Sequence, residues 1–311
     1  MSNRKHLAPG GAPMPLDRAK VQKFGTKGMA FDGGVLHAGP INRPNWEPYQ
    51  PGEDGYGGSG TSIFDPVLCE LVYRWFCPPG GTVLDPFAGG SVRGIVAAKC
   101  GLEYVGIDLS ARQVEANEAQ AEEICADGIR PVWIVGDSAN IDALAAGVEA
   151  DLVFSCPPYF DLEVYSDAPG ELSQMKWPEF LQVYGAIIAE VCGHLKQNRF
   201  ACFVVGDVRD KQGFYLNFPG ETIRAFQDAG ARLYNEAVLV TAVGSLPIRI
   251  GAQFTSGRKL GKTHQNVLVF YKGDPRKIKA EFPQELEFGK GSEESPAGSG
   301  PAETARPLES P

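Results

Sequence analysis

Short apolar runs alternate with segments of helical periodicity between residues 62 and 271. Residues 62–76 carry apolar and aromatic side chains at helical spacing, and Asp65-Pro66 suits the start of a helix. The apolar runs that follow are short enough to be buried strands. Residues rich in Gly, Pro or Asp end most of these runs, which indicates turns between the elements.

The order of the elements indicates the fold class. A capping pair, Ser110 and Gln113, marks the start of one helix. The alternation predicts an α/β fold, with a doubly wound, mostly parallel sheet of seven strands and helices on both faces. We predict helices over 62–76, 92–100, 111–126, 177–195 and 221–229, and strands over 82–84, 104–107, 131–135, 151–154, 200–205, 233–241 and 266–271.

Composition divides the chain into three parts. Residues 1–60 hold twelve glycines and seven prolines with little periodicity, which predicts an irregular arm. Residues 61–281 contain the whole predicted sheet, and the connection 242–264 within them is predicted to be a long basic loop. Residues 282–311 are rich in Gly, Pro, Ser and Glu, which is typical of a disordered acidic tail.

The net charge of −9 is distributed unevenly along the chain. Residues 245–280 contain eight Lys or Arg residues and one acid, so the remainder is strongly negative. Such a separation favours a local surface that faces a polyanion. With 43% hydrophobic and 22% charged residues, the composition is typical of a soluble globular protein.

The cysteines and histidines argue against a metal site and against disulfides. The seven cysteines form no CxxC pair, and the four histidines are scattered away from them. We therefore expect reduced, mostly buried thiols in a cytoplasmic protein. No apolar run approaches the roughly 20 residues of a membrane span, and the first residues lack the apolar core of a signal peptide.

Acidic residues follow three consecutive predicted strands. Asp85, Asp108 and Asp137-Ser138 stand at strand ends, and ligands of open α/β sheets bind beyond the carboxyl ends of the strands. Asp108 follows Asp85 by 23 residues, where an acid can accept hydrogen bonds from both hydroxyls of a ribose. Asp137 is placed to reach the amino group of an adenine. Dinucleotide and P-loop glycine motifs are absent from the sequence, which argues against a dehydrogenase or an NTPase.

Two turns complete this pattern. Asp85-Pro86-Phe87-Ala88-Gly89-Gly90 has two glycines that allow a ligand to approach the backbone closely. Ser155-Cys156-Pro157-Pro158-Tyr159 follows the fourth strand, and its prolines fix a stiff, extended turn with an aromatic ring behind it. The carbonyl groups of residues 156 and 157 suit the edge of a flat, amine-bearing ring.

The combination resembles the amino-methyltransferases that use S-adenosylmethionine, specifically the DNA adenine-N6 and cytosine-N4 enzymes. Residues 85–90 are similar to the family's cofactor motif Asp-Pro-Phe-x-Gly-x-Gly, and residues 155–159 to its catalytic motif Asp/Asn/Ser-Pro-Pro-Tyr. Phe64-Asp65-Pro66 resembles the element that holds the methionine end of the cofactor. Residues 159–166 and 260–273 look like phage and prophage methylases, and the resemblance covers roughly residues 60–280.

The resemblance implies a Rossmann-like fold of the class I methyltransferase type and site-specific methylation of a flipped adenine or cytosine in DNA. It implies that catalysis depends on acceptors that draw on the amine hydrogens and on the Tyr159 ring stacked on the base. The implied catalytic residues are Ser155, Cys156, Pro157, Pro158 and Tyr159. The implied S-adenosylmethionine site comprises Phe64, Asp85, Phe87, Gly89, Gly90, Asp108, Asp137 and Ser138.

Cys156 departs from the family pattern, which has Asp, Asn or Ser directly before Pro-Pro. A thiol is a poor hydrogen-bond acceptor, and the side chain of Ser155 is expected to point to the other side of the strand. The target base is therefore open between adenine and cytosine. Two alternatives also stay open: an RNA guanine-N2 methyltransferase, and an inactive cofactor-binding subunit that recognises DNA.

The basic segment is the predicted contact with DNA. Arg249, Arg258, Lys259 and Lys262 are the candidates for contacts with the phosphate backbone. For any single one of them, a solvent-exposed charge on a loop is an equally good explanation.

Overall fold

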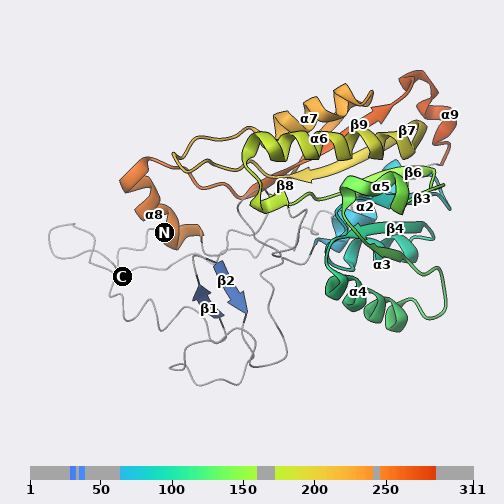
Figure 1. Ribbon diagram of the computed structural model, residues 1–311, viewed down its shortest axis with the longest axis horizontal. Helices are drawn as coiled ribbons and strands as arrows, with labels where there is room; N and C mark the ends of the chain where they lie inside the picture. Colours follow the sequence, from blue (N-terminus) through green and yellow to red (C-terminus); the bar gives the residue numbers. More distant parts are fainter. Residues whose placement is uncertain (1–28, 33–34, 39–63, 160–171, 241–245, 285–311) are drawn as a thin grey trace, which may run out of the picture.

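The computed structural model describes residues 29–32, 35–38, 64–159, 172–240 and 246–284 (Figure 1). A seven-stranded sheet with strand order β5-β4-β3-β6-β7-β9-β8 forms its centre. The pairs from β5 to β7 are parallel, and β9 runs antiparallel to both β7 and β8. The predicted doubly wound, Rossmann-like sheet of the class I methyltransferase type is confirmed.

The strand order reverses between β3 and β6, which is the point where open α/β sheets bind their ligands. The strands of this sheet are β3 (Thr82–Asp85), β4 (Glu103–Asp108), β5 (Val132–Val135), β6 (Ala150–Ser155), β7 (Leu195–Val205), β8 (Arg232–Val240) and β9 (His264–Lys272). The helices are α2 (Pro66–Phe76), α3 (Val92–Lys99), α4 (Ala111–Ile124), α5 (Ile141–Leu144), α6 (Trp177–His194), α7 (Phe218–Asp228), α8 (Leu246–Gly257) and α9 (Ile278–Glu281).

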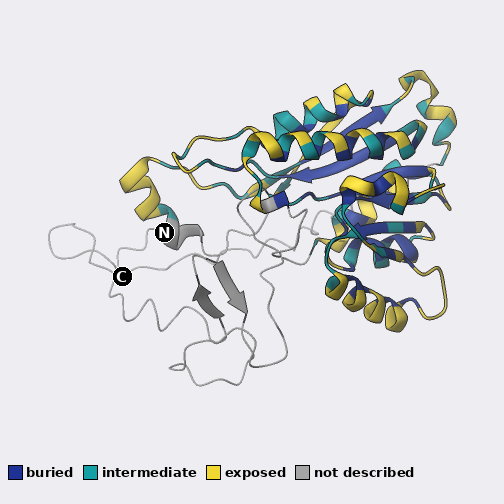
Figure 2. Ribbon diagram, viewed as in Figure 1, coloured by how far each residue is buried: buried dark blue, intermediate teal, exposed yellow. Residues whose placement is uncertain are grey.

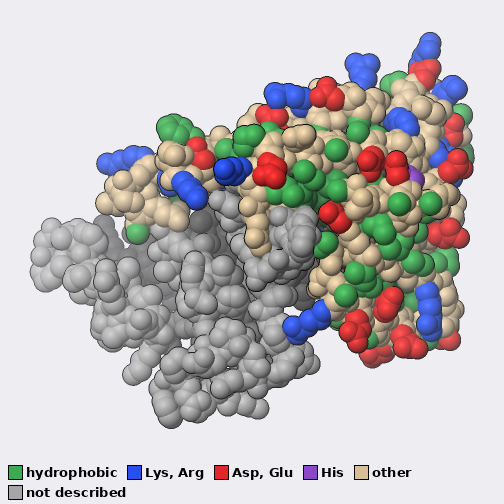
Figure 3. Space-filling view, in the orientation of Figure 1, with side chains coloured by type: hydrophobic (Ala, Val, Ile, Leu, Met, Phe, Trp, Pro, Cys, Tyr) green, Lys and Arg blue, Asp and Glu red, His purple; other side chains and the backbone are tan. Residues whose placement is uncertain are grey.

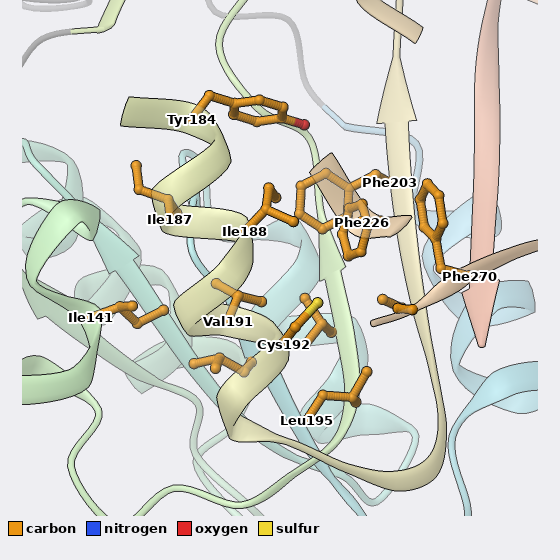
Figure 4. Close-up of a cluster of buried hydrophobic side chains, with 14 of the residues drawn as sticks. Ile141, Tyr184, Ile187, Ile188, Val191, Cys192, Leu195, Phe203, Phe226 and Phe270 are labelled. Carbon is orange, nitrogen blue, oxygen red and sulfur yellow. The ribbon is translucent and has the colours of Figure 1, made fainter. Parts of the chain in front are cut away.

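Successive residues of the central strands pack alternately into two separate hydrophobic cores. Leu84 and Phe203 belong to the core under α5, α6 and α7, whereas Val83 and Cys202 belong to the core under α2, α3 and α4. This period of two explains why the central strands are apolar on both faces. Figure 2 shows the sheet buried between the two helical layers, and Figure 4 shows the apolar stripe of α6 against the sheet.

The predicted capping pair forms only half of the expected box. The Ser110 hydroxyl accepts a hydrogen bond from the Gln113 amide, as predicted. The Gln113 side chain donates instead to Asn117, and the Ser110 amide donates to the Asp108 carboxylate. The acid at the end of β4 therefore takes the place of the capping glutamine.

Besides the short helices α5 and α9, which were not predicted, three segments differ from the sequence prediction. The predicted loop 242–264 contains the helix α8. The strand β7 begins at Leu195, directly after α6, because Lys272 Nζ donates to the carbonyl oxygens of Cys192 and Leu195 (both 2.6 Å) and so satisfies the helix end. An antiparallel hairpin, β1 (Met29–Asp32) and β2 (Val35–Ala38), lies in the segment predicted to be irregular.

The cysteines match the expectation of free, mostly buried thiols. All seven cysteines are free, and all but Cys100 and Cys156 are buried. Burial raises the pKa of Cys69 and Cys192 to about 12.

Phe282 packs on Phe200 with ring centroids 5.2 Å apart, and the predicted tail beyond residue 284 lies outside the described residues. Among the described helices, none combines the length and the apolarity that crossing a bilayer requires.

Candidate functional site

Asp85, at the end of β3, is fully buried and both of its carboxylate oxygens are engaged inside the protein. Oδ2 accepts hydrogen bonds from Arg93 Nε (2.6 Å) and from the Tyr104 hydroxyl (2.7 Å). Oδ1 accepts from Ser155 Oγ (2.5 Å) and from the Phe87 amide (3.1 Å). This carboxylate therefore joins β3, β4, α3 and β6 at one point of the strand-end edge.

Arg93, like Tyr104, is a residue of this cluster that the sequence analysis missed as part of the site. Its guanidinium, which is buried, donates to the carbonyl oxygens of Phe87 (2.6 Å) and Ala88 (2.9 Å) and lies 4.6 Å from the centre of the Phe64 ring. Burial is the largest single effect and opposes its charge, but the attraction and hydrogen bond of Asp85, together with the effects of Tyr104 and Cys156, outweigh burial and raise the pKa of Arg93 above its ordinary value. A lone charge in an otherwise apolar helical run, Val-Arg-Gly-Ile-Val-Ala-Ala, was the available indication, because such residues are buried only when paired.

Asp108, at the end of β4, fixes the glycine turn. Its Oδ2 accepts from the Gly89 amide (2.8 Å) and its Oδ1 from the Ser110 amide (2.8 Å). Burial raises the pKa of Asp108 above its ordinary value, against the opposing effect of these two amides. Asn117 on α4, also absent from the sequence analysis, donates to the Gly89 carbonyl (2.7 Å). Gly89 has φ +52°, so the turn is held in a conformation that favours glycine.

Asp137 and Ser138 bring the end of β5 to the same edge. Ser138 is buried, and its hydroxyl donates to the carbonyl oxygen of Pro86 in the glycine turn. The carboxylate of Asp137 accepts from the Ala139 amide (2.9 Å) and caps a short turn. The ends of β3, β4 and β5 are thus linked by side-chain hydrogen bonds, as their shared position at one edge predicts.

The Pro-Pro-Tyr turn lies beside this group. Ser155 is fully buried, and its hydroxyl donates to the Asp85 carboxylate; that its side chain points to the other side of the strand from Cys156 stays a prediction. Cys156 is half-buried, and its Sγ lies 3.6 Å from the Tyr159 hydroxyl. Gln265, near the start of β9, donates to that hydroxyl, and the Tyr159 ring lies next to Gly206 at the end of β7. Gln265 is 106 residues from Tyr159, and no local pattern indicates the contact.

The two phenylalanines of the predicted cofactor site are half-buried on opposite sides of the cluster. Phe64 packs edge-on against Phe154 with ring centroids 5.7 Å apart. Phe87 stacks on Tyr184 with centroids 6.2 Å apart. Both rings shape the walls of the strand-end edge, and their contact with a cofactor stays a prediction.

The predicted DNA-contacting residues lie on and after α8. Arg258 is exposed, and its guanidinium lies 5.1 Å from the centre of the Phe254 ring. Lys259 and Lys262 are half-buried. Arg249 is part of α8, but its side chain lies outside the described residues. In Figure 3, Lys and Arg side chains gather on the described surface around α8.

No protein-family model and no curated protein matches the sequence. Among solved structures, TrmN from Thermus thermophilus matches with 17% identity and a TM-score of 0.46 over 67% of this chain and 49% of that chain, so this chain spans about half of its length.

Two further matches have similar scores. Magnesium protoporphyrin IX methyltransferase from Synechocystis PCC 6803, with bound SAM, has 14% identity and a TM-score of 0.43 over 66% of this chain and 79% of that chain. A putative rRNA-methylase from Clostridium thermocellum has 12% identity and a TM-score of 0.43 over 68% and 99%. At these levels the likenesses carry no information on substrate, and the fold is established by this chain's own strand order.

Proposed function

We propose that this protein is an S-adenosylmethionine-dependent DNA methyltransferase that modifies the exocyclic amine of a flipped adenine (N6) or cytosine (N4). The observation that carries the proposal is the hydrogen bond from Ser155 Oγ to Asp85 Oδ1 (2.5 Å). It joins the turn that resembles the cofactor motif to the turn that resembles the catalytic motif, although they are 70 residues apart in the sequence. The two resemblances thus support a single site.

The residues at the strand ends fit S-adenosylmethionine, which supplies an electrophilic sulfonium methyl group when bound. A Cβ added at Gly89 or Gly90 would meet no atom within 4 Å, so there is open space over the turn. Asp108 is half-buried beside this space, where its carboxylate can accept hydrogen bonds from ribose hydroxyls. Asp137 is half-buried at the next strand end, within the same edge. Phosphate groups would be repelled by this set of carboxylates, whereas a sulfonium cation is not.

The Pro-Pro-Tyr turn suits the amine of a base. An exocyclic amine conjugates with its ring and is a weak nucleophile, so the enzyme must draw electron density onto the nitrogen. The carbonyl groups of residues 156 and 157 can accept the two amine hydrogens, since the prolines at 157 and 158 end the strand and fix an extended turn. Tyr159 is held through its hydroxyl by Gln265, which fixes the plane of a ring that can stack on the base.

The direct test is incubation of the protein with labelled S-adenosylmethionine and DNA of mixed sequence, followed by digestion to nucleosides. We expect label in N6-methyladenine or N4-methylcytosine, and RNA in place of DNA is the matched arm. Label in N2-methylguanine of RNA, with none in DNA, would contradict the proposed substrate and favour the RNA alternative.

Cys156 supports one further candidate, a cofactor-binding but inactive subunit that recognises DNA. Its thiol lies beside the Tyr159 hydroxyl where related turns have a stronger acceptor. If the wild-type protein binds S-adenosylhomocysteine but transfers no methyl group, Cys156→Asp and Cys156→Ser should create activity. If the wild-type protein already transfers methyl groups, the inactive-subunit function is excluded.

Replacing Gly90 by valine separates cofactor binding from folding. Gly90 is exposed, its φ is not in the left-handed region, and an added Cβ would meet nothing within the protein, so the free energy of unfolding should change by less than about 0.5 kcal/mol. The valine would occupy the space proposed for the cofactor, at a cost of about 1–3 kcal/mol and hence about 5- to 150-fold in affinity. Calorimetric titration with S-adenosylhomocysteine measures the loss. Gly128→Val, in an exposed turn at the opposite edge, is the matched control.

A further inference from the structure

A cleft of about 570 Å³ lies between the β7–α7 connection and the C-terminal half of α8. We name it the basic cleft. The connection that forms one wall begins at Gly206, next to the Tyr159 ring, so the same segment contacts the Pro-Pro-Tyr turn and lines the cleft. Its other wall leads through Lys262 to Gln265, which binds the Tyr159 hydroxyl. Its lining residues are Arg209, Gln212, Gly213, Phe214, Gln253, Ser256, Gly257, Arg258 and Lys259.

The two walls of the basic cleft are in contact with each other. A Cβ added at Gly213 would stand 2.9 Å from Lys259 Cε, so the lysine side chain lies directly on the connection. Arg209 donates to the Gly213 carbonyl (2.7 Å) and its guanidinium lies 3.7 Å from the centre of the Tyr215 ring. Arg209 and Lys259 are thus placed by these contacts, and Arg258 lines the same hollow.

Among the described residues, no carboxylate forms an ion pair with the three cations that line the basic cleft. These cations are Arg209, Arg258 and Lys259. The two acids of the connection are used in its turns: Asp207 accepts from the Phe218 amide (3.2 Å) and Asp210 from the Phe214 amide (2.8 Å). The cleft therefore suits an anionic ligand.

An aromatic ring stands at the cleft without a core to pack into. Phe214 is 73% exposed, and the neighbouring Tyr215 and Phe254 rings are also exposed. Rings interleaved with cations are the combination that binds single strands, because bases stack on the rings while phosphates meet the cations. A duplex presents no exposed base face to such a ring.

We propose that the basic cleft binds an unstacked strand of DNA beside the target base, with a base stacked on Phe214 and phosphates at Arg258 and Lys259. The inference rests on the proposed function, because it extends the same substrate away from the Pro-Pro-Tyr turn. A flipped base leaves its neighbours partly unstacked, and the cleft provides a place for one of them.

The test is fluorescence anisotropy with the full chain and a labelled single-stranded DNA of about 20 nucleotides and mixed sequence, longer than the roughly 4–16 that such a module covers. We expect Phe214→Ala to weaken binding about 5- to 150-fold, with Phe214→Trp retaining it. Binding of S-adenosylhomocysteine should be unchanged in both variants. Phe214→Ala should weaken the affinity for the corresponding duplex by less than about threefold, because the bases of a duplex are stacked on one another.

The cations are tested by the salt dependence of binding. Arg258→Gln combined with Lys259→Gln should reduce the slope of log affinity against log salt by about 1.4 between about 50 and about 200 mM salt. Lys99→Gln combined with Arg130→Gln, two exposed cations at the opposite edge, is the matched control and should not change it.

Unchanged single-strand binding by Phe214→Ala, or equal slopes for the two double variants, overturns the inference. Stronger binding of single-stranded RNA, with the Phe214 effect confined to RNA, overturns DNA as the occupant. Failure of methyl transfer with an intact Phe214 effect would contradict the proposed function alone. Methyl transfer that is indifferent to Phe214 would contradict the cleft alone.

Discussion

Replacing Arg93 by methionine is expected to lower the free energy of unfolding by about 3–5 kcal/mol. The change removes the guanidinium that neutralises Asp85 and leaves a fully buried carboxylate without its counter-ion. It also removes the donors to the Phe87 and Ala88 carbonyls, which hold the glycine turn. Urea unfolding followed by circular dichroism measures the loss.

Two further variants test whether the buried charge is the cause. Arg74→Met removes an exposed ion pair with Glu70 on α2 and should leave stability nearly unchanged. Arg93→Met combined with Asp85→Asn should be more stable than Arg93→Met alone, because the unpaired charge is gone. If Arg93→Met is no more destabilising than Arg74→Met, the buried pair does not stabilise this fold.

Replacing Asp108 by asparagine is expected to weaken the binding of S-adenosylhomocysteine about 10- to 150-fold. The variant keeps the shape of the side chain and one oxygen for the Gly89 or Ser110 amide, but it loses the charge that strengthens hydrogen bonds from ribose hydroxyls. Calorimetric titration measures the affinity. Asp127→Asn, an exposed residue at the opposite edge, is the matched control and should bind normally.

The same residue gives the binding a pH dependence. Because burial raises the pKa of Asp108, its carboxylate takes up a proton at a less acidic pH than an ordinary aspartate does. The ionised form is the one that accepts from the ribose, so wild-type affinity should fall as the pH decreases through this raised pKa. The affinity of Asp108→Asn should not follow that curve. If the wild-type affinity is as independent of pH as that of Asp108→Asn, Asp108 does not contact the ribose.

The sheet was predictable because its central strands are apolar on both faces and end in acids or prolines. Helix α8 was not, because residues 246–257 contain a proline, two glycines and several β-branched residues, all poor helix formers. The described part of this helix from residue 251 onward is exposed, so it lacks an apolar stripe as well. The start of β7 was missed for a similar reason, since residues 196–199 are all polar.

The sequence predicted which residues stand at the strand ends of the candidate site, but it did not predict the hydrogen bonds that connect them. Position after a strand is visible in the sequence, and Asp85, Asp108 and Asp137 were found by it. The partners of these residues, Arg93 and Asn117, come from helices that cross the strand ends only after folding. Gln265 reaches Tyr159 from the antiparallel strand β9, which depends on the topology of the whole sheet.

The hydrogen bond between Ser155 and Asp85 has a consequence for how this protein can be divided. Residues 64–149 contain every element of the proposed adenosine pocket. This part alone would lack β6, so Asp85 would lose a buried neighbour strand and one of its four donors. The pocket and the Pro-Pro-Tyr turn therefore share part of one buried polar cluster, and dividing the chain between them would leave Asp85 with three donors.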